Sequence, residues 1–179
     1  AVALKSGTGS GSNATPTSLK LNAKNNLHVS STVEGQAAKA YALSIEGGHS
    51  SFETSALLKA DTISLKANSE KSGSKSEARS YGIYDSAVNS KTQVDARKIA
   101  IESASNYAAF GVGLYGFVGT GPDLRIGSSS TETVMITSVG TEGAYGFLAG
   151  DTARFSSGLP NIKGFDSDNE GENSSTVYG

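Results

Sequence analysis

The segment Ile99-Ala100-Ile101 places one small residue between two large apolar residues, and this short pattern recurs along the chain. Earlier copies are Leu27-His28-Val29 and Ile63-Ser64-Leu65, and later ones are Val134-Met135-Ile136 and the stretch from Ile162 to Phe165. Apolar residues at every second position are typical of a strand with one buried face. A repeat of a few tens of residues indicates stacked structural units.

Two further apolar segments lie between successive copies, always in the same order. One has an aromatic residue followed by a small and a large apolar residue, as in Ala40-Tyr41-Ala42-Leu43, Ser80-Tyr81-Gly82-Ile83, Leu114-Tyr115-Gly116-Phe117 and Ala144-Tyr145-Gly146-Phe147. The other comprises Leu19-Lys20-Leu21, Phe52, Val94, Leu124-Arg125-Ile126 and Phe155. Ala1-Val2-Ala3-Leu4 fits the aromatic segment with Val2 in place of Tyr, and Val177-Tyr178-Gly179 is expected to begin a fifth copy.

Three short strands per period predict an all-β parallel β-helix of about five coils over residues 1–179, a single solenoid segment. Helical repeats are disfavoured because clusters of Ser, Gly, Asn and Thr interrupt every candidate helix. Stacking should align Tyr41, Tyr81, Tyr115 and Tyr145, either inside the coil or as an outer ladder, and we favour the interior. Both ends of the sequence lie in the same phase of the repeat. We therefore expect a piece of a longer array whose uncapped ends self-associate.

The composition argues against several classes of function. The formal net charge is −2, which offers no field to gather phosphates or anionic lipid, so neither nucleic acid nor a membrane surface is expected as a partner. The chain has no Cys, hence no disulfide and no thiolate metal site, and this is typical of proteins that cross a bacterial envelope unfolded. It contains 29 Ser and 22 Gly, which predict a hydroxyl-rich surface. We recognise no signal peptide and no membrane-spanning segment.

Three motifs could carry chemistry, and each has a plainer explanation that we prefer. Gly111-Val112-Gly113-Leu114-Tyr115-Gly116 matches a dinucleotide-binding fingerprint, but Phe117-Val118-Gly119 cannot start the helix which that site requires, so close packing in a strand is expected. The acidic stretch from Asp166 to Glu172 resembles the opening of a calcium loop, yet Val177 stands where a bidentate Glu belongs. The loop from Ser69 to Ser80 is rich in charge and is expected to be a solvated loop without ligand.

Catalytic groups are sparse. His28 lies in an apolar alternation and His49 in a turn, and Gly48-His49-Ser50-Ser51 lacks the glycine spacing of a nucleophile elbow. A polysaccharide-cleaving β-helix would need clustered carboxylates. The candidates Asp61, Asp95, Asp123 and Asp151 fall at expected turn positions and form no cluster in the sequence. We therefore predict no catalytic, cofactor or metal site.

The small-Tyr-Gly-aliphatic segments, the Ile-x-Ile segments and the linkers rich in Ser, Thr, Asn and Gly resemble the passenger region of Gram-negative autotransporters, especially large adhesin-like ones. The resemblance covers the whole chain, and its motifs are loose. It implies a right-handed β-helix, exported by a C-terminal outer-membrane barrel absent from this chain and displayed on the bacterial cell surface.

Two functions are consistent with these observations. The first is a non-catalytic surface adhesin or spacer, a stiff column whose polar loops meet a host protein or a glycan. The second is a carbohydrate-active β-helix that cuts or grips a polysaccharide. An enzyme should have carboxylates in a concave cleft with aromatic sugar platforms outside, whereas a spacer should have a featureless face. We favour the first.

Overall fold

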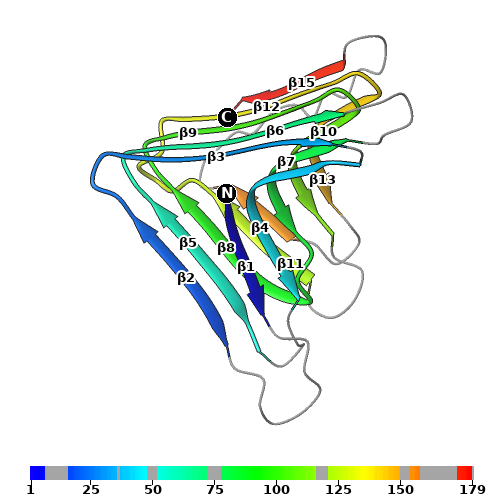
Figure 1. Cartoon of the computed structure of the whole chain (residues 1–179). Coiled ribbons are helices and arrows are strands. Elements are labelled where there is room, and N and C mark those ends of the chain that lie inside the picture. The colour runs from blue at the N-terminus through cyan, green and yellow to red at the C-terminus, as the bar shows by residue number, and fades with distance from the viewer. Residues whose placement is uncertain are drawn as a thin grey trace.

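The chain folds into an all-β parallel β-solenoid, which confirms the fold class predicted from the repeat (Figure 1). The computed structural model describes residues 1–6, 16–35, 37–47, 52–71, 78–115, 121–149, 154–157 and 173–178. Within these residues every regular element is a strand, and there is no helix, so none that could cross a lipid bilayer.

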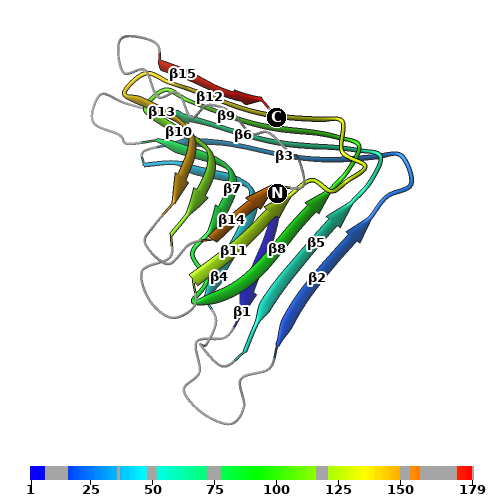
Figure 2. The same ribbon diagram turned by 180° about the vertical axis from the view of Figure 1, so that it is seen from behind.

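Three sheets form the walls of the solenoid, and the chain passes from one wall to the next with each strand (Figures 1 and 2). Sheet A consists of β1 (Val2–Ser6), β4 (Lys39–Gly47), β7 (Arg79–Asp85), β10 (Ala108–Leu114) and β13 (Gly143–Ala149). Sheet B consists of β2 (Thr17–Asn22), β5 (Thr54–Lys59), β8 (Asn89–Asp95), β11 (Gly121–Ile126) and β14 (Arg154–Ser157). Sheet C consists of β3 (Asn26–Gly35), β6 (Thr62–Lys71), β9 (Lys98–Ser105), β12 (Thr133–Gly140) and β15 (Asn173–Tyr178). A coil is therefore three consecutive strands, one from each sheet.

Apolar side chains from all three walls fill the interior. The register of sheet C aligns equivalent residues of successive coils, as the repeat predicted. Its two columns of large inward residues are Leu27, Ile63, Ile99 and Val134, and Val29, Leu65, Ile101 and Ile136. Ile63, Leu65 and Ile101 are fully buried, and burying each aliphatic side chain of this size stabilises the fold by roughly 1.5–3 kcal/mol relative to leaving it in water. The alternation seen in the sequence thus builds the core.

The expectation of five equivalent coils is wrong. The strand β15 pairs antiparallel with β12, so the last strand of sheet C does not continue the parallel winding. Val177 and Tyr178 accordingly lie opposite Ile136 and Met135 in sheet C, and they do not start another strand of sheet A. The predicted segment from Ile162 to Phe165 lies outside the described residues.

The predicted alignment of sheet A is also wrong in two places. Phe110, and not Tyr115, is the partner of both Tyr81 and Tyr145. Val2 pairs with Leu43, two residues beyond Tyr41. A similar displacement occurs in sheet B, where Phe52 precedes β5 and the columns of Leu19 and Leu21 continue through Ala56 and Leu58. In each case the sequence has a second apolar residue within a few positions of the residue that takes the register position.

A bend in sheet A breaks the simple alternation of its strands. In β4, the consecutive residues Ala42 and Leu43 are both fully buried in the core, so the pleat is interrupted between them. Gly82 and then Gly111 take the place of Ala42 in the next two coils. A Cβ added at Gly82 would overlap Cγ2 of Ile101 and lie 2.7 Å from the carbonyl oxygen of Gly111. Small residues are therefore required where sheet A turns toward sheet C.

Replacing Gly82 by Ala tests this packing. The added methyl group must displace Ile101, so we expect the free energy of unfolding in urea to fall by about 1–3 kcal/mol. In the preceding coil the equivalent pair is Ala42 and Leu65, and Leu lacks the branch at Cβ that causes the overlap. Adding Ile101→Leu to Gly82→Ala should therefore restore part of the loss. An additive double-mutant cycle would contradict this account of the bend.

Candidate functional site

Aromatic rings gather on the outer face of sheet A. Tyr41, Tyr81, Phe110 and Tyr145 occupy one register position in β4, β7, β10 and β13. Their rings stack one on the next, with centroids 5.3, 4.6 and 4.9 Å apart and interplanar angles of 17°, 8° and 8°. Offset stacking of this kind adds roughly 0.5–1.5 kcal/mol per pair. We call these four residues the aromatic stack.

The stack lies outside the solenoid, so the interior position favoured from the sequence is wrong and the outer ladder is correct. In β4 the residues on both sides of Tyr41, Ala40 and Ala42, belong to the core, which forces the tyrosine between them outward. The aromatic residues form a hydrophobic cluster of their own. The two middle rings of the stack are nevertheless covered by their neighbours, and only 4% of Tyr81 and 7% of Phe110 is exposed.

Two more tyrosines extend the cluster beside the stack. Tyr84 lies 5.0 Å from Tyr41 and 5.1 Å from Tyr81, measured between ring centroids. Tyr115 packs edge-on against Tyr81, and its hydroxyl donates a hydrogen bond of 3.3 Å to the Tyr81 hydroxyl. Gly113 makes room for this arrangement, since a Cβ there would lie 2.9 Å from the Tyr115 ring. Tyr115 thus contributes to the same surface from a position five residues away from the stack.

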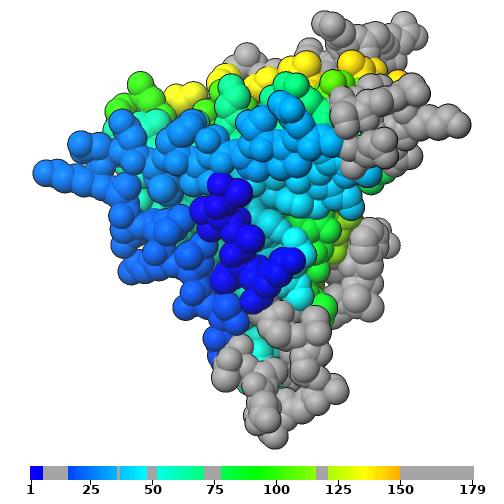
Figure 3. All heavy atoms as spheres, viewed as in Figure 1, coloured from blue at the N-terminus to red at the C-terminus, as the bar shows by residue number. Residues whose placement is uncertain are grey.

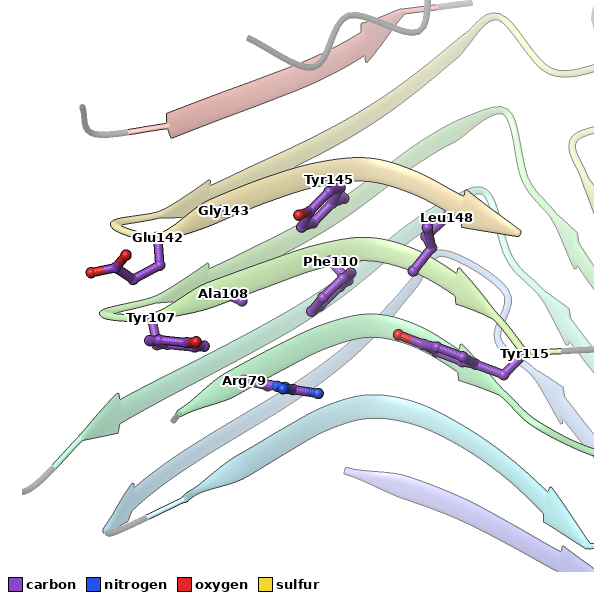
Figure 4. A pocket seen from close by; sticks show the side chains of 9 residues that line it. All are labelled: Arg79, Tyr107, Ala108, Phe110, Tyr115, Glu142, Gly143, Tyr145 and Leu148. Atoms are coloured by element: carbon purple, nitrogen blue, oxygen red, sulfur yellow. The ribbon is translucent and has the colours of Figure 1, made fainter. Parts of the chain in front are cut away.

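A pocket of about 430 Å³ opens on this face (Figure 4). Its lining residues come from β7, β10 and β13 and from the chain next to them, and they are Arg79, Tyr107, Ala108, Phe110, Tyr115, Glu142, Gly143, Tyr145 and Leu148. Arg79, Ala108 and Gly143 are in register, and the last two have too little side chain to fill the space in front of the strands. The pocket therefore results from small residues beside the aromatic stack.

Two phenol groups of this face, those of Tyr41 and Tyr115, are held in their neutral form. Burial, and then the neighbouring Tyr84 and Tyr81, raise the pKa of Tyr41 to about 12. Burial, followed by the hydrogen bond to Tyr81, raises the pKa of Tyr115 well above its usual value. These hydroxyl groups can consequently donate and accept hydrogen bonds at any physiological pH, but they cannot act as bases.

Charged side chains elsewhere pair across successive coils. Arg97 donates from Nε and Nη2 to the two carboxylate oxygens of Asp61, at 2.9 and 3.0 Å, and from Nη1 to Glu132 at 2.9 Å. These hydrogen bonds lower the pKa of Asp61 and raise that of Arg97. Lys59 lies 3.4 Å from Asp95, and similar pairs join Lys66 to Glu102 and Lys5 to Glu46. The two members of each pair occupy equivalent positions in successive coils, so these pairs favour the native register of the strands.

Of the four carboxylates considered for catalysis the structure describes three, and each belongs to a different part of the fold. Asp61 precedes β6 and binds Arg97, Asp95 ends β8 beside Lys59, and Asp123 lies within β11. His28 is exposed on β3. Gly111 and Gly113 lie within the strand β10. Among the described residues no group of three His, Cys, Asp or Glu side chains could hold a metal ion.

Several sequence candidates cannot be placed. His49, Asp151 and the acidic stretch from Asp166 to Glu172 lie outside the described residues, as do residues 72–77 of the charged loop. Arg79, which follows that loop, begins β7 and lines the pocket. Its role at the aromatic face was not foreseen from the sequence, and neither were those of Tyr107, Phe110 and Glu142.

One buried carboxylate was also missed. Asp85 ends β7, is fully buried and stands in register with the apolar residues Ile45 and Leu114. Its oxygens accept hydrogen bonds from the Ser90 hydroxyl at 2.8 Å, the Ala87 amide at 3.1 Å and the Thr92 hydroxyl at 3.3 Å. Burial nonetheless outweighs these donors and raises the pKa of Asp85 to about 6. All three donors belong to β8 or to the turn before it, so Asp85 joins sheet A to sheet B.

Comparisons with protein-family models, with curated proteins and with solved structures gave no match for this chain.

Asp85 predicts a specific dependence of stability on pH. Its pKa is higher in the folded chain, about 6 against an ordinary 3.8, so folding favours the protonated form. The corresponding stabilisation is complete below pH 3.8 and is lost as the pH rises through 6, a change of about 3 kcal/mol. Asn cannot ionise and its amide can donate to Ser90 or Thr92. We therefore expect Asp85→Asn to become more stable relative to wild type between pH 4 and pH 7.

Urea unfolding across this pH range measures the difference between the two proteins. Ser90→Ala serves as a second variant, since loss of a donor to the carboxylate should raise the pKa of Asp85 further and so enlarge the total loss of stability with rising pH. A difference between Asp85→Asn and wild type that stays constant from pH 4 to pH 7 would show that Asp85 does not titrate as described.

Proposed function

We propose that this chain is a non-catalytic segment of a bacterial cell-surface protein, a right-handed β-helical column that belongs to an adhesin of the autotransporter type. Its role is to hold a stiff, regular scaffold away from the cell and to offer a binding surface to a glycan or protein of a host, and its ends associate with further copies. The resemblance of the repeat to autotransporter passengers supports the location. The parallel β-solenoid supports the role as a column.

The observation that carries the non-catalytic part of the proposal is the arrangement of the carboxylates. Glycoside hydrolysis in most families needs two carboxyl groups on opposite sides of one bond, about 5–10 Å apart. Among the described residues that line the aromatic pocket, Glu142 is the single carboxylate. Asp61, Asp95, Glu46 and Glu102 are each paired with a cation of a neighbouring coil and do not line the pocket.

The aromatic face favours binding over a purely mechanical role. A spacer needs no hollow on its surface, whereas this chain leaves a concave, half-apolar pocket beside an ordered stack of rings. Concave sites with an apolar lining and a few polar groups are typical of ligand recognition. We therefore keep binding, without cleavage, as the activity of the segment. Here the surface that binds is the outer face of a sheet, whereas the sequence had pointed to the loops.

The proposal predicts that purified chain releases no reducing ends from polysaccharides. We would incubate it with starch, cellulose, xylan, mannan and polygalacturonate and measure products over a day at several pH values. The expected signal equals that of buffer, because among the described residues the pocket holds one carboxylate, and Arg97 binds both Asp61 and Glu132. The matched variant is Glu142→Gln, which removes the one carboxylate of the pocket. Product formation by the wild type that is lost in Glu142→Gln would overturn the proposal and identify an enzyme.

A further inference from the structure

We propose that the pocket beside the aromatic stack binds one sugar unit of a neutral glycan. This inference rests on the proposed adhesive function and names its ligand class. The pocket has the volume expected for a small-ligand site, about 430 Å³ within the usual range of roughly 300–1,000 Å³. It is built on three neighbouring strands of a rigid sheet, which fixes its shape before any ligand arrives.

The apolar part of the lining suits the hydrocarbon faces of a pyranose ring. Phe110 and Tyr145 form the middle of the pocket, and Tyr115 and Leu148 stand toward the ends of the strands (Figure 4). Within the stack Phe110 has Tyr81 against one face and Tyr145 against the other, so it presents its edge to the pocket. Tyr107 differs, since it lies outside the stack at the start of β10 and can offer its ring face to a ligand. A sugar C–H surface packs against such rings without strict orientation.

The polar part of the lining stands at the opposite side of the pocket, where the strands begin. Glu142 lies there with Tyr107, and the side chain of Arg79 extends from the start of β7 to below Phe110, as Figure 4 shows. Arg79 offers only donors, Glu142 only acceptors, and the phenols of Tyr107 and Tyr145 offer both. Sugar hydroxyl groups also donate and accept, so vicinal hydroxyls can satisfy this mixed set. The ligand would thus place its hydroxyl edge toward Arg79 and Glu142 and its apolar face toward Phe110.

Charge decides between classes of sugar. Among the described residues the lining carries one positive and one negative side chain, so their formal charges cancel. A uronate or sialic acid would gain from Arg79 but would face repulsion from Glu142, and an amino sugar with a free ammonium group would meet the reverse situation. A neutral ligand is attracted to both. The net charge of the whole chain, −2, also offers no long-range attraction for an anionic polymer.

Ligand-observed NMR titration tests the inference on the whole chain. The probes are maltotetraose, cellotetraose, xylotetraose and mannotetraose as neutral glycans and tetragalacturonate as an acidic one. We expect at least one neutral tetrasaccharide to bind in the micromolar to millimolar range, and tetragalacturonate to bind at least ten-fold more weakly. Tyr107→Ala removes the ring that lies outside the stack, and Ala108→Leu fills part of the pocket. Each variant should weaken binding ten-fold or more.

Controls separate the pocket from the fold. Glu34→Gln changes an exposed carboxylate on β3, in another sheet, and should leave binding unchanged. Thermal melting monitored by circular dichroism establishes that each variant is folded, and if Ala108→Leu unfolds, Tyr107→Ala carries the test. Absence of binding by every neutral probe, equal binding of tetragalacturonate, or binding unaffected by both variants would overturn the inference. Hydrolysis of a bound probe would instead overturn the proposed non-catalytic function.

Discussion

The structure depends on main-chain hydrogen bonds between equivalent strands of successive coils. These bonds satisfy backbone groups that would otherwise be buried without partners. They also fix the register, and a slip by one residue would turn the core face of a strand outward. Identical or complementary residues therefore lie on one another, as Ile63 does on Ile99, Lys66 on Glu102, and the Ser69 hydroxyl on that of Ser105 at 3.0 Å. The aromatic stack is the same effect on the outer face.

Buried polar side chains form hydrogen bonds where one sheet of the solenoid meets the next. The Ser138 hydroxyl accepts a hydrogen bond from Ser103 at 3.0 Å and donates one to the carbonyl of Tyr145 at 2.8 Å, where sheet A bends. Asp85 similarly joins sheet A to sheet B. Among the described residues, the Ser80 hydroxyl is the one buried side-chain group without a hydrogen-bond partner. A polar group of this kind in a dry core costs stability unless it is paired, and here most are paired.

The four parallel strands of sheet C were predictable because strict alternation of large apolar residues has one physical meaning, a strand with one buried face. Sheet A was harder, because the bend at Ala42 puts two consecutive residues in the core and so reverses which face the tyrosines occupy. Ala109-Phe110-Gly111-Val112 fits the aromatic segment at least as well as Leu114-Tyr115, and it was the usable signal for Phe110. The pocket was not predictable, since it follows from the small residues Ala108 and Gly143 meeting across strands.

Disulfide cross-linking tests the register of the strands, on which the core and the aromatic stack depend. The chain has no native Cys, so only the introduced pair can form a disulfide within the chain. Ser64 and Ala100 are register partners on neighbouring strands of sheet C, and adjacent strands lie about 4.8 Å apart, within reach of a disulfide. Oxidation of the variant Ser64→Cys/Ala100→Cys should give the intramolecular disulfide in most molecules, whereas Ser64→Cys/Glu102→Cys, two residues out of register, should give little. Equal cross-linking of the two variants, or none in the first, would contradict the stacked coils.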